Sequence, residues 1–193
     1  MAQMVKEETK RGMLHMRKEN EEVFYRDDKV IQVKASDINW LINQAEGNLR
    51  KRARLCTHRN TEELLHEMFI VLARDTYIKP HKHLGKPESF HVLEGLVDVV
   101  LFDENGDVLE MMRMGNYESG MAFYYRILDP LYHTLLIRSN VLVFHETTTG
   151  PFNPTDTVFA PWSPEADDKN ACKAFESELL KKLISLNDVR EVA

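Results

Sequence analysis

The stretch PHKHLGKPESFHVLEG, residues 80–95, decides how this chain is interpreted. It places His81, His83, Glu88 and His91 close together and ends in an apolar run and a glycine. Alternate side chains of a strand share a face, so His81 and His83 would lie on one face, roughly 6.6 Å apart along the strand. The break LGKP lets the next run return antiparallel and carry Glu88 opposite the two histidines. The spacing therefore predicts a metal site.

The donor atoms in this stretch indicate a transition metal. Two histidines and one carboxylate are typical ligands of mononuclear Fe(II), and Mn, Ni, Co or Zn would accept them as well. A further ligand is expected from a later strand, because His133 begins an apolar run after the proline turn in DPLYHTLLIRS. His91 lies three residues beyond Glu88, so strand parity places it on the opposite face. We expect one divalent transition metal (Fe, Mn, Ni or Zn) on His81, His83, Glu88 and His133.

Short β-rich runs follow one another from about residue 66 and are separated by turn-like breaks. Examples are SFHVLEG, LVDVVLF, VLEMMRM, HTLLIRS and VLVFHETT. Strands this short and this frequent predict an antiparallel sandwich or barrel. Nothing in this region resembles alternating strand–helix units.

A hairpin and a short helix are expected before the β region, and a longer helix is expected after it. EEVFYRDDKVIQVKA predicts a hairpin with strands at Val23–Tyr25 and Val30–Val33, and SDINWLINQA predicts a short amphipathic helix capped by Ser36. A stripe from Phe175 to Leu186 predicts a C-terminal helix on the outside of the β body. We expect an N-terminal extension over residues 1–50, a barrel over 51–163 and the C-terminal helix over 164–193. Residues 1 to about 20 are charged and are expected to be frayed or loosely docked.

The net charge, the cysteine count and the apolar runs limit the partners and the compartment to be expected. The formal net charge of -6 gives no general reason to expect nucleic-acid binding. The two cysteines, Cys56 and Cys172, form no disulfide framework, which fits a reducing compartment. No apolar run has the length of a signal peptide or a membrane span. The expectation is a cytoplasmic protein with a small-molecule ligand and without nucleic-acid or membrane partners.

The opening stretch resembles the first motif of the cupin superfamily, in which HxH is followed by three or four residues, Glu, six residues and Gly. Here the pattern is HxHx4Ex6G over residues 81–95, although Asp75 stands where the family pattern has an earlier glycine. In the second motif Pro130 and His133 fit. The resemblance implies a mainly β fold: a cupin-type antiparallel β-barrel, or jelly roll, with the N-terminal hairpin and helix and the C-terminal helix added to it.

A narrower resemblance covers about residues 52–165. The segments RARLCTH, YIKPHKH, ESFHVLEG, YYRI, YHT, FHETTTGPF and FAPWSPE are together similar to the WbuC family of cupin-fold metalloproteins. Some members of that family occur with polysaccharide and O-antigen gene sets, which implies a sugar-like substrate. Cupins are often dimers, so a homodimer is expected, with the N-terminal hairpin adding edge strands across the interface.

Several further polar residues are candidates for the site. His145 and Glu146 are adjacent on one run and face opposite ways, and the sequence leaves open which of them points inward. Tyr124, Tyr125 and Arg126 are consecutive on another run. The candidate catalytic residues are His58, Glu146 and Tyr125, and the candidate substrate-binding residues are Arg52, Arg54, Arg126 and Lys86.

These features support several functions. The first is a metal-dependent isomerase or epimerase that acts on a small sugar-like or carboxylate substrate, with His58 or Glu146 as the base. The alternatives are a non-catalytic metal- or ligand-binding cupin that serves as a sensor or accessory protein, and an Fe(II) dioxygenase. A metal with a purely structural role ranks last, because a barrel already has its own core.

Overall fold

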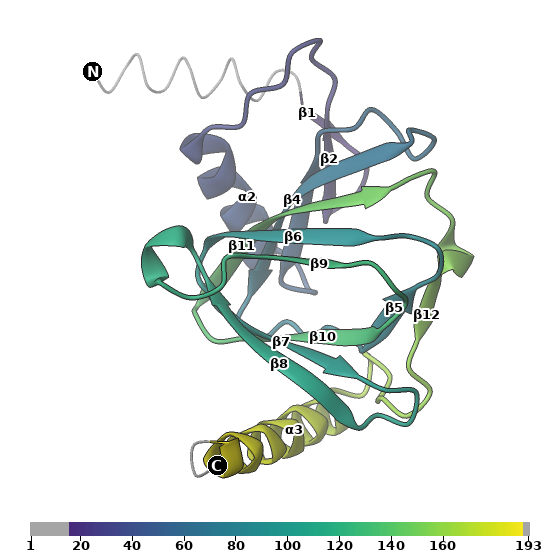
Figure 1. Ribbon diagram of the computed structural model, residues 1–193. Helices are drawn as coiled ribbons and strands as arrows, with labels where there is room; N and C mark the ends of the chain where they lie inside the picture. The colour runs from purple at the N-terminus through teal and green to yellow at the C-terminus, as the bar shows by residue number, and fades with distance from the viewer. Residues whose placement is uncertain (1–15, 191–193) are drawn as a thin grey trace.

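The computed structural model describes residues 16–190, with side chains described up to residue 185. Two β-sheets face each other, and one helix lies on the outer side of each sheet (Figure 1). Most of the frayed extension expected for residues 1 to about 20 lies outside the described residues. Within the described part, no helix combines the length and the apolar character that crossing a bilayer requires.

The strand order is that of a jelly roll. The seven-stranded sheet has the order β1-β2-β3-β4-β11-β6-β9, and the five-stranded sheet has the order β12-β5-β10-β7-β8. From β4 onward the chain passes repeatedly between the two sheets, and the ladders between the strands named below are antiparallel except that of β2 with β3. This topology confirms the predicted mainly β, cupin-type barrel.

The elements have the following bounds: β1 (Met16–Lys18), β2 (Val23–Arg26), α2 (Ala35–Gly47), β3 (Arg52–Cys56), β4 (Leu65–Ala73), β5 (His81–His83), β6 (Glu88–Glu94), β7 (Leu96–Phe102), β8 (Val108–Gly115), η1 (Tyr117–Ser119), β9 (Tyr124–Ile127), β10 (Tyr132–Ile137), β11 (Val141–Thr149), η2 (Pro154–Asp156), β12 (Thr157–Phe159) and α3 (Lys169–Arg190).

The core between the sheets is apolar, and it is built by strand alternation. On β6, Phe90 and Val92 point inward, and Phe90 stacks on Phe144 of β11 with ring centroids 4.0 Å apart. Val97 and Val99 of β7 meet them from the other sheet. Residues of the same strands with the opposite parity therefore face outward, toward the helices or toward solvent.

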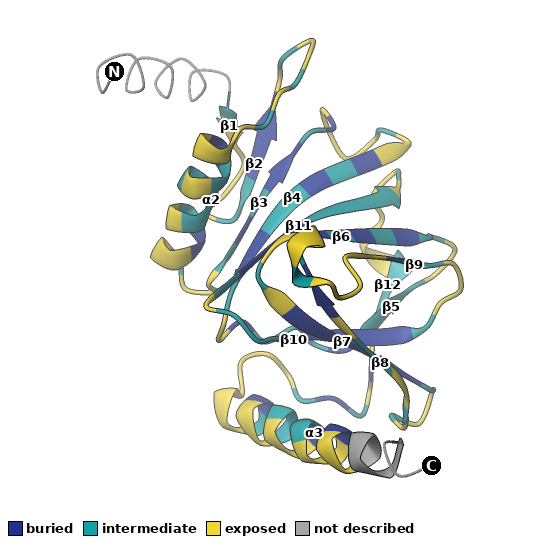
Figure 2. Cartoon of the chain, turned by 60° about the vertical axis from the view of Figure 1, so that its left-hand side comes forward, coloured by how far each residue is buried: buried dark blue, intermediate teal, exposed yellow. Residues whose placement is uncertain are grey.

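Each helix covers the outer face of one sheet, and Figure 2 shows its buried stripe turned toward that sheet. Leu41 and Ala45 of α2 pack on Leu55 and Val71 of the seven-stranded sheet. The predicted helix is confirmed, but its cap was wrong. The helix begins one residue before Ser36, where Asp37 accepts a hydrogen bond from the backbone N–H of Lys34 at 2.8 Å.

The helix α3 covers the five-stranded sheet. Leu179 and Leu183 pack against Val100, Phe102 and Leu136, which lie on the outward faces of β7 and β10. The stripe that predicted this helix is therefore the face that docks, as far as its side chains are described.

The N-terminal hairpin forms, but the prediction placed one of its strands wrongly. β2 pairs with β1, which precedes it, whereas residues 30–33 form no strand. The turn is built around Asn20, whose side-chain oxygen accepts hydrogen bonds from the N–H groups of Glu22 and Val23 at 2.9 and 3.0 Å. The other edge of β2 pairs with β3. Both edges of β2 are therefore occupied, and a strand at residues 30–33 has no edge of β2 left to join.

Gly95, in the turn between β6 and β7, offers a test of the barrel geometry. Its φ is +92°, and an added Cβ would collide with the Val141 carbonyl oxygen and the Ser139 hydroxyl. We expect Gly95→Ala to lower the free energy of unfolding by about 2–4 kcal/mol. Gly85→Ala is the matched control, since Gly85 has φ +66° but no atom within 4 Å of the added Cβ. It should cost only about 1 kcal/mol. Equal losses for both variants in urea unfolding would contradict this account of the turn.

Candidate metal centre

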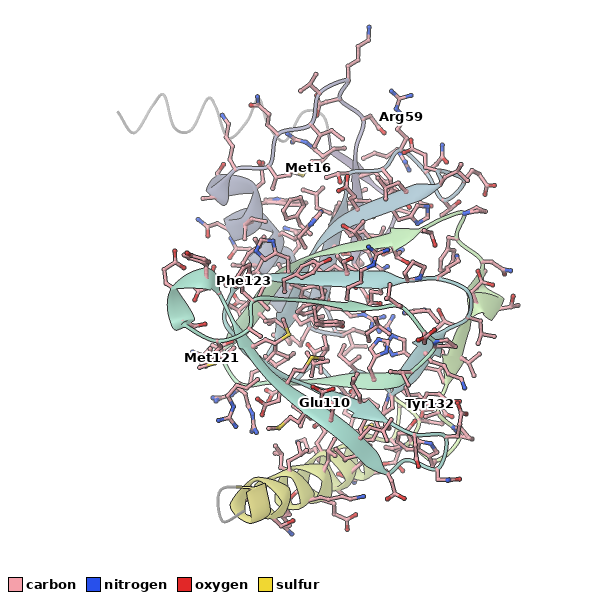
Figure 3. All side chains as sticks on the ribbon, viewed as in Figure 1. Met16, Arg59, Glu110, Met121, Phe123 and Tyr132 are labelled. Carbon is pink, nitrogen blue, oxygen red and sulfur yellow. The ribbon has the colours of Figure 1, made fainter. Side chains whose placement is uncertain are left out.

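Three histidines meet on the inner face of the five-stranded sheet. His81 and His83 share a face of β5, and His133 of β10 is the register partner of His81. Tyr132, labelled in Figure 3, marks the start of β10, one residue before His133. One ring nitrogen from each histidine lies within 4.8 Å of the other two. This is the spacing at which imidazoles can share one ion.

The fourth predicted ligand comes from the opposite sheet. Glu88 is the first residue of β6, and it is buried. One carboxylate oxygen, Oε2, lies 3.2 Å from His83 Nε2, and the other, Oε1, lies 3.7 Å from His133 Nε2. The structure thus brings all four residues together, and the cluster spans both sheets.

Backbone carbonyls orient two of the histidines. Nδ1 of His81 and Nδ1 of His133 each face the carbonyl oxygen two residues earlier, at 2.8 and 3.0 Å. A carbonyl only accepts hydrogen bonds, so each Nδ1 carries a hydrogen, and in the neutral tautomer that this selects Nε2 is the nitrogen available to a metal. Such outer hydrogen bonds are the usual way in which proteins orient metal-binding imidazoles.

A hydroxyl holds the third histidine. Thr157 Oγ1 lies 3.2 Å from His83 Nδ1, because β12 pairs with β5 and places Thr157 opposite His83. The sequence analysis missed Thr157. Only the register between two strands far apart in sequence identifies it.

The charge states of the cluster suit a metal ion. Burial, and then the neighbouring His133 and His83, lower the pKa of His81 to about 3, so this imidazole is neutral. Burial alone would raise the pKa of Glu88, but His133 and His83 outweigh it and hold the value at about 2. Metal ligands must be neutral imidazoles and ionised carboxylates. His81 and Glu88 therefore have the charge states of metal ligands, and by their spacing the three histidines could hold a divalent metal that Glu88 completes.

Two more predicted residues lie beside these ligands. The Tyr125 hydroxyl donates a hydrogen bond to Glu88 Oε1 at 3.0 Å, and burial together with Glu88 raises its pKa well above the usual value. Glu146 lies on β11 opposite Phe90 of β6, on the inward face. Among the side chains of residues 16–185, none forms a hydrogen bond or ion pair with its carboxyl. Burial, and then the Glu88 carboxylate, raise the pKa of Glu146 to about 8.

The structure also shows which of the neighbours His145 and Glu146 points into the barrel. His145 points outward, where its Nε2 lies 3.8 Å from a Glu67 oxygen. Its register partner on β6 is His91, which also faces away from the cluster. The prediction that His91 stands apart from the ligands agrees with this register.

The four predicted cationic residues do not gather at one place. Arg52 forms an ion pair with Glu22 at 2.8 Å, and Lys86 forms one with Asp156 at 2.9 Å. Arg126 is exposed on β9, and its parity is opposite to that of inward-facing Tyr125. Arg54 lies on β3 and faces the barrel side of the seven-stranded sheet.

His58 is buried at the end of β3, away from the four ligands in the sheet order. Its ring stacks on His66 with centroids 4.1 Å apart, and its Nδ1 lies 3.2 Å from the Glu67 carbonyl oxygen. Burial lowers the pKa of His58, followed by the neighbouring His66. The structure therefore places Glu146 and Tyr125, rather than His58, next to Glu88.

Comparison with known proteins gives partial matches. The model of a family described as "Domain of unknown function (DUF6016)" matches residues 33–114. No curated protein matches the chain.

Among solved structures, a protein from Shewanella oneidensis has a TM-score of 0.45 and 10% identity over 55% of this chain and 72% of that chain. A mutant of oxalate decarboxylase from Bacillus subtilis has a TM-score of 0.42 and 18% identity over 50% of this chain. The capsular polysaccharide assembling protein CapF from Staphylococcus aureus has a TM-score of 0.42 and 18% identity over 51% of this chain. The match spans only 24% of the decarboxylase chain and 27% of the CapF chain.

The raised pKa of Glu146 makes the stability of the metal-free protein depend on pH. Folding favours the protonated carboxyl. The contribution of Glu146 to the unfolding free energy is therefore complete below the ordinary pKa of 4.5 and is lost as pH rises through about 8. Glu146→Gln removes this titration. Between these two pH values, wild type should lose roughly 1–4 kcal/mol of unfolding free energy relative to Glu146→Gln. Urea unfolding of both proteins across this range measures the loss. A pH-independent difference would contradict it.

Proposed function

We propose that the protein binds one divalent transition metal through His81, His83, Glu88 and His133 and acts as a metal-dependent isomerase or epimerase. The substrate would be a small sugar-like or carboxylate compound. The observation that carries the proposal is Glu146, an inward-facing carboxyl without a partner among the described residues, next to four clustered ligands. A carboxyl in this position, with a pKa of about 8, can exchange protons near neutral pH.

Each residue has a separate task in this scheme. When bound, the metal would supply Lewis-acid polarisation of a substrate oxygen. Glu146 would take a proton from the substrate or return one, and the near-neutral pKa of its carboxyl suits both directions. Tyr125, through its hydrogen bond to Glu88 Oε1, keeps that carboxylate oriented toward the histidines.

The narrower family assignment belongs to the same proposal. The segments RARLCTH, FHETTTGPF and FAPWSPE support a WbuC-type cupin, and they support a substrate related to polysaccharides. Two of the residues to which a role is proposed lie in these family-like segments: Arg54 in the first and Glu146 in the second.

The metal site is tested by a matched pair of histidine variants. His83→Ala removes an imidazole that lies 3.2 Å from Glu88, whereas His91→Ala removes one on the outer face of the next strand. After anaerobic loading with Fe(II), Mn(II), Ni(II) or Zn(II), mass spectrometry should find about one ion per wild-type chain. We expect at least a tenfold loss of affinity in His83→Ala and none in His91→Ala. Equal metal content in all three proteins would refute the site.

The proposed reaction is tested with the metal-loaded protein. Nucleotide sugars and small hydroxy or keto acids are incubated in D2O, and NMR detects exchange of a substrate hydrogen. Glu146→Gln should lower the exchange rate by roughly a hundredfold or more without loss of metal. A protein that binds metal and ligand but exchanges no hydrogen would instead be a non-catalytic binding protein.

A further inference from the structure

Arg54 differs from the other cationic residues predicted at the site. Its neighbours on β3, Ala53 and Leu55, pack under α2, so Arg54 points to the opposite face, toward the barrel side. The polar contact of its guanidinium within the described chain is a weak one, 3.9 Å to the sulfur of Met68. No described carboxylate lies within ion-pair distance of it.

Glu146, on the same face of the sheet, is a carboxyl that likewise has no ion-pair partner among the described residues. Arg54 pairs with Ile70 of β4, and Glu146 pairs with Met68 of the same strand. The two residues therefore lie on strands separated only by β4 and are offset by two residues, so their backbones are roughly 12 Å apart across the sheet. The guanidinium is close enough that its charge lowers the pKa of Glu146, against the larger effect of burial.

Arg54 and Glu146 thus lie near each other on one face of the sheet, and neither has an ion-pair partner among the described residues. A half-buried guanidinium without a counter-ion is costly, and a nearby carboxyl would ordinarily satisfy it. Here the separation across β4 keeps the two groups apart. Arginine presents a planar fork of donors that matches carboxylate and phosphate oxygens. A ligand that carries both an anionic group and a hydroxyl would satisfy both residues.

We propose that Arg54 and Glu146 bracket a binding subsite for an anionic group with a neighbouring hydroxyl. Arg54 forks onto the carboxylate or phosphate, and Glu146 contacts the hydroxyl. This rests on the proposed function, since Glu146 also lies next to Glu88 and so links the subsite to the metal ligands. The order along the sheet is Glu88 on β6, Glu146 on β11 and Arg54 on β3, with β4 between the last two.

The surroundings of Arg54 suit a ligand of this kind. Cys56 and Tyr25 pack together in one cluster with Met68, and Arg54 lowers the pKa of the Cys56 thiol against the larger effect of burial. His58 also senses the charge of Arg54. The ligand class that would fit the Arg54 and Glu146 groups is a hydroxy acid, or a sugar derivative that carries a carboxylate or phosphate.

The test compares three small probes by isothermal titration calorimetry: glycerate, glycerol phosphate and uncharged glycerol. We expect wild type to bind at least one anionic probe and to bind glycerol at least tenfold more weakly. Arg54→Met should weaken anion binding roughly 10- to 100-fold, because a charge-assisted hydrogen-bond pair is lost. Arg74→Met is the matched control. Arg74 is an exposed arginine at the far end of β4, and its hydrogen bond is to the carbonyl oxygen of Arg138. It should leave binding unchanged.

The outcomes separate this proposal from that of the metal enzyme. Each titration is repeated after chelation, and metal content is measured for every variant. Failure of wild type to bind metal refutes the proposed function, while an Arg54-dependent loss of anion binding in the chelated protein still supports the subsite. Preference for glycerate or for glycerol phosphate identifies the carboxylate or the phosphate as the anion. Absence of anion binding by wild type, or equal binding by wild type and Arg54→Met, overturns the subsite.

Discussion

The approach of the Glu88 carboxylate to the imidazoles of the opposite sheet is the constraint on which the rest of the structure depends. A buried carboxylate is costly unless opposite charge or hydrogen-bond donors meet it. Here His83 and His133 approach its two oxygens, and Tyr125 donates a hydrogen bond to one of them. Since these partners come from both sheets, the two sheets must meet in one register for the charge to be satisfied.

This constraint divides the barrel interior into two regions. One region is an apolar core in which Phe90, Val97 and Phe144 interdigitate. The other region is polar and contains the four candidate ligands together with Glu146. Strand alternation joins the regions directly, because Glu88 and Phe90 are two positions apart on one strand and face the same way. The core thus holds the polar residues in place from one side.

Local spacing could predict the ligand set but not its surroundings. The alternation of His81 and His83, the turn before Glu88 and the parity of His91 are all local properties of one or two strands, and the structure brings the ligands together as they indicate. The role of Thr157 depends on the pairing of β12 with β5, which leaves no local signal. The choice between His145 and Glu146 depends on which face of β11 meets the core.

The surroundings of the cationic residues were likewise not predictable from local sequence patterns. Arg52, Arg54 and Arg126 look alike in sequence, but Arg52 pairs with Glu22 and Arg126 lies on an outer face. The misplaced hairpin strand has a related cause, since β3 pairs in parallel with β2 and takes the edge that residues 30–33 would have needed. Long-range pairing determined these outcomes, whereas the predictions used local patterns.

The central claim is that one metal ion joins the two sheets through three imidazoles and one carboxylate. X-ray absorption spectroscopy on the metal-loaded protein, compared with the Glu88→Gln variant, tests it most directly. The account predicts three nitrogen ligands from imidazole and one carboxylate oxygen at roughly 2.0–2.2 Å, with the oxygen ligand lost or lengthened in the variant. A metal spectrum without imidazole scattering, or one that is identical in both proteins, would contradict it.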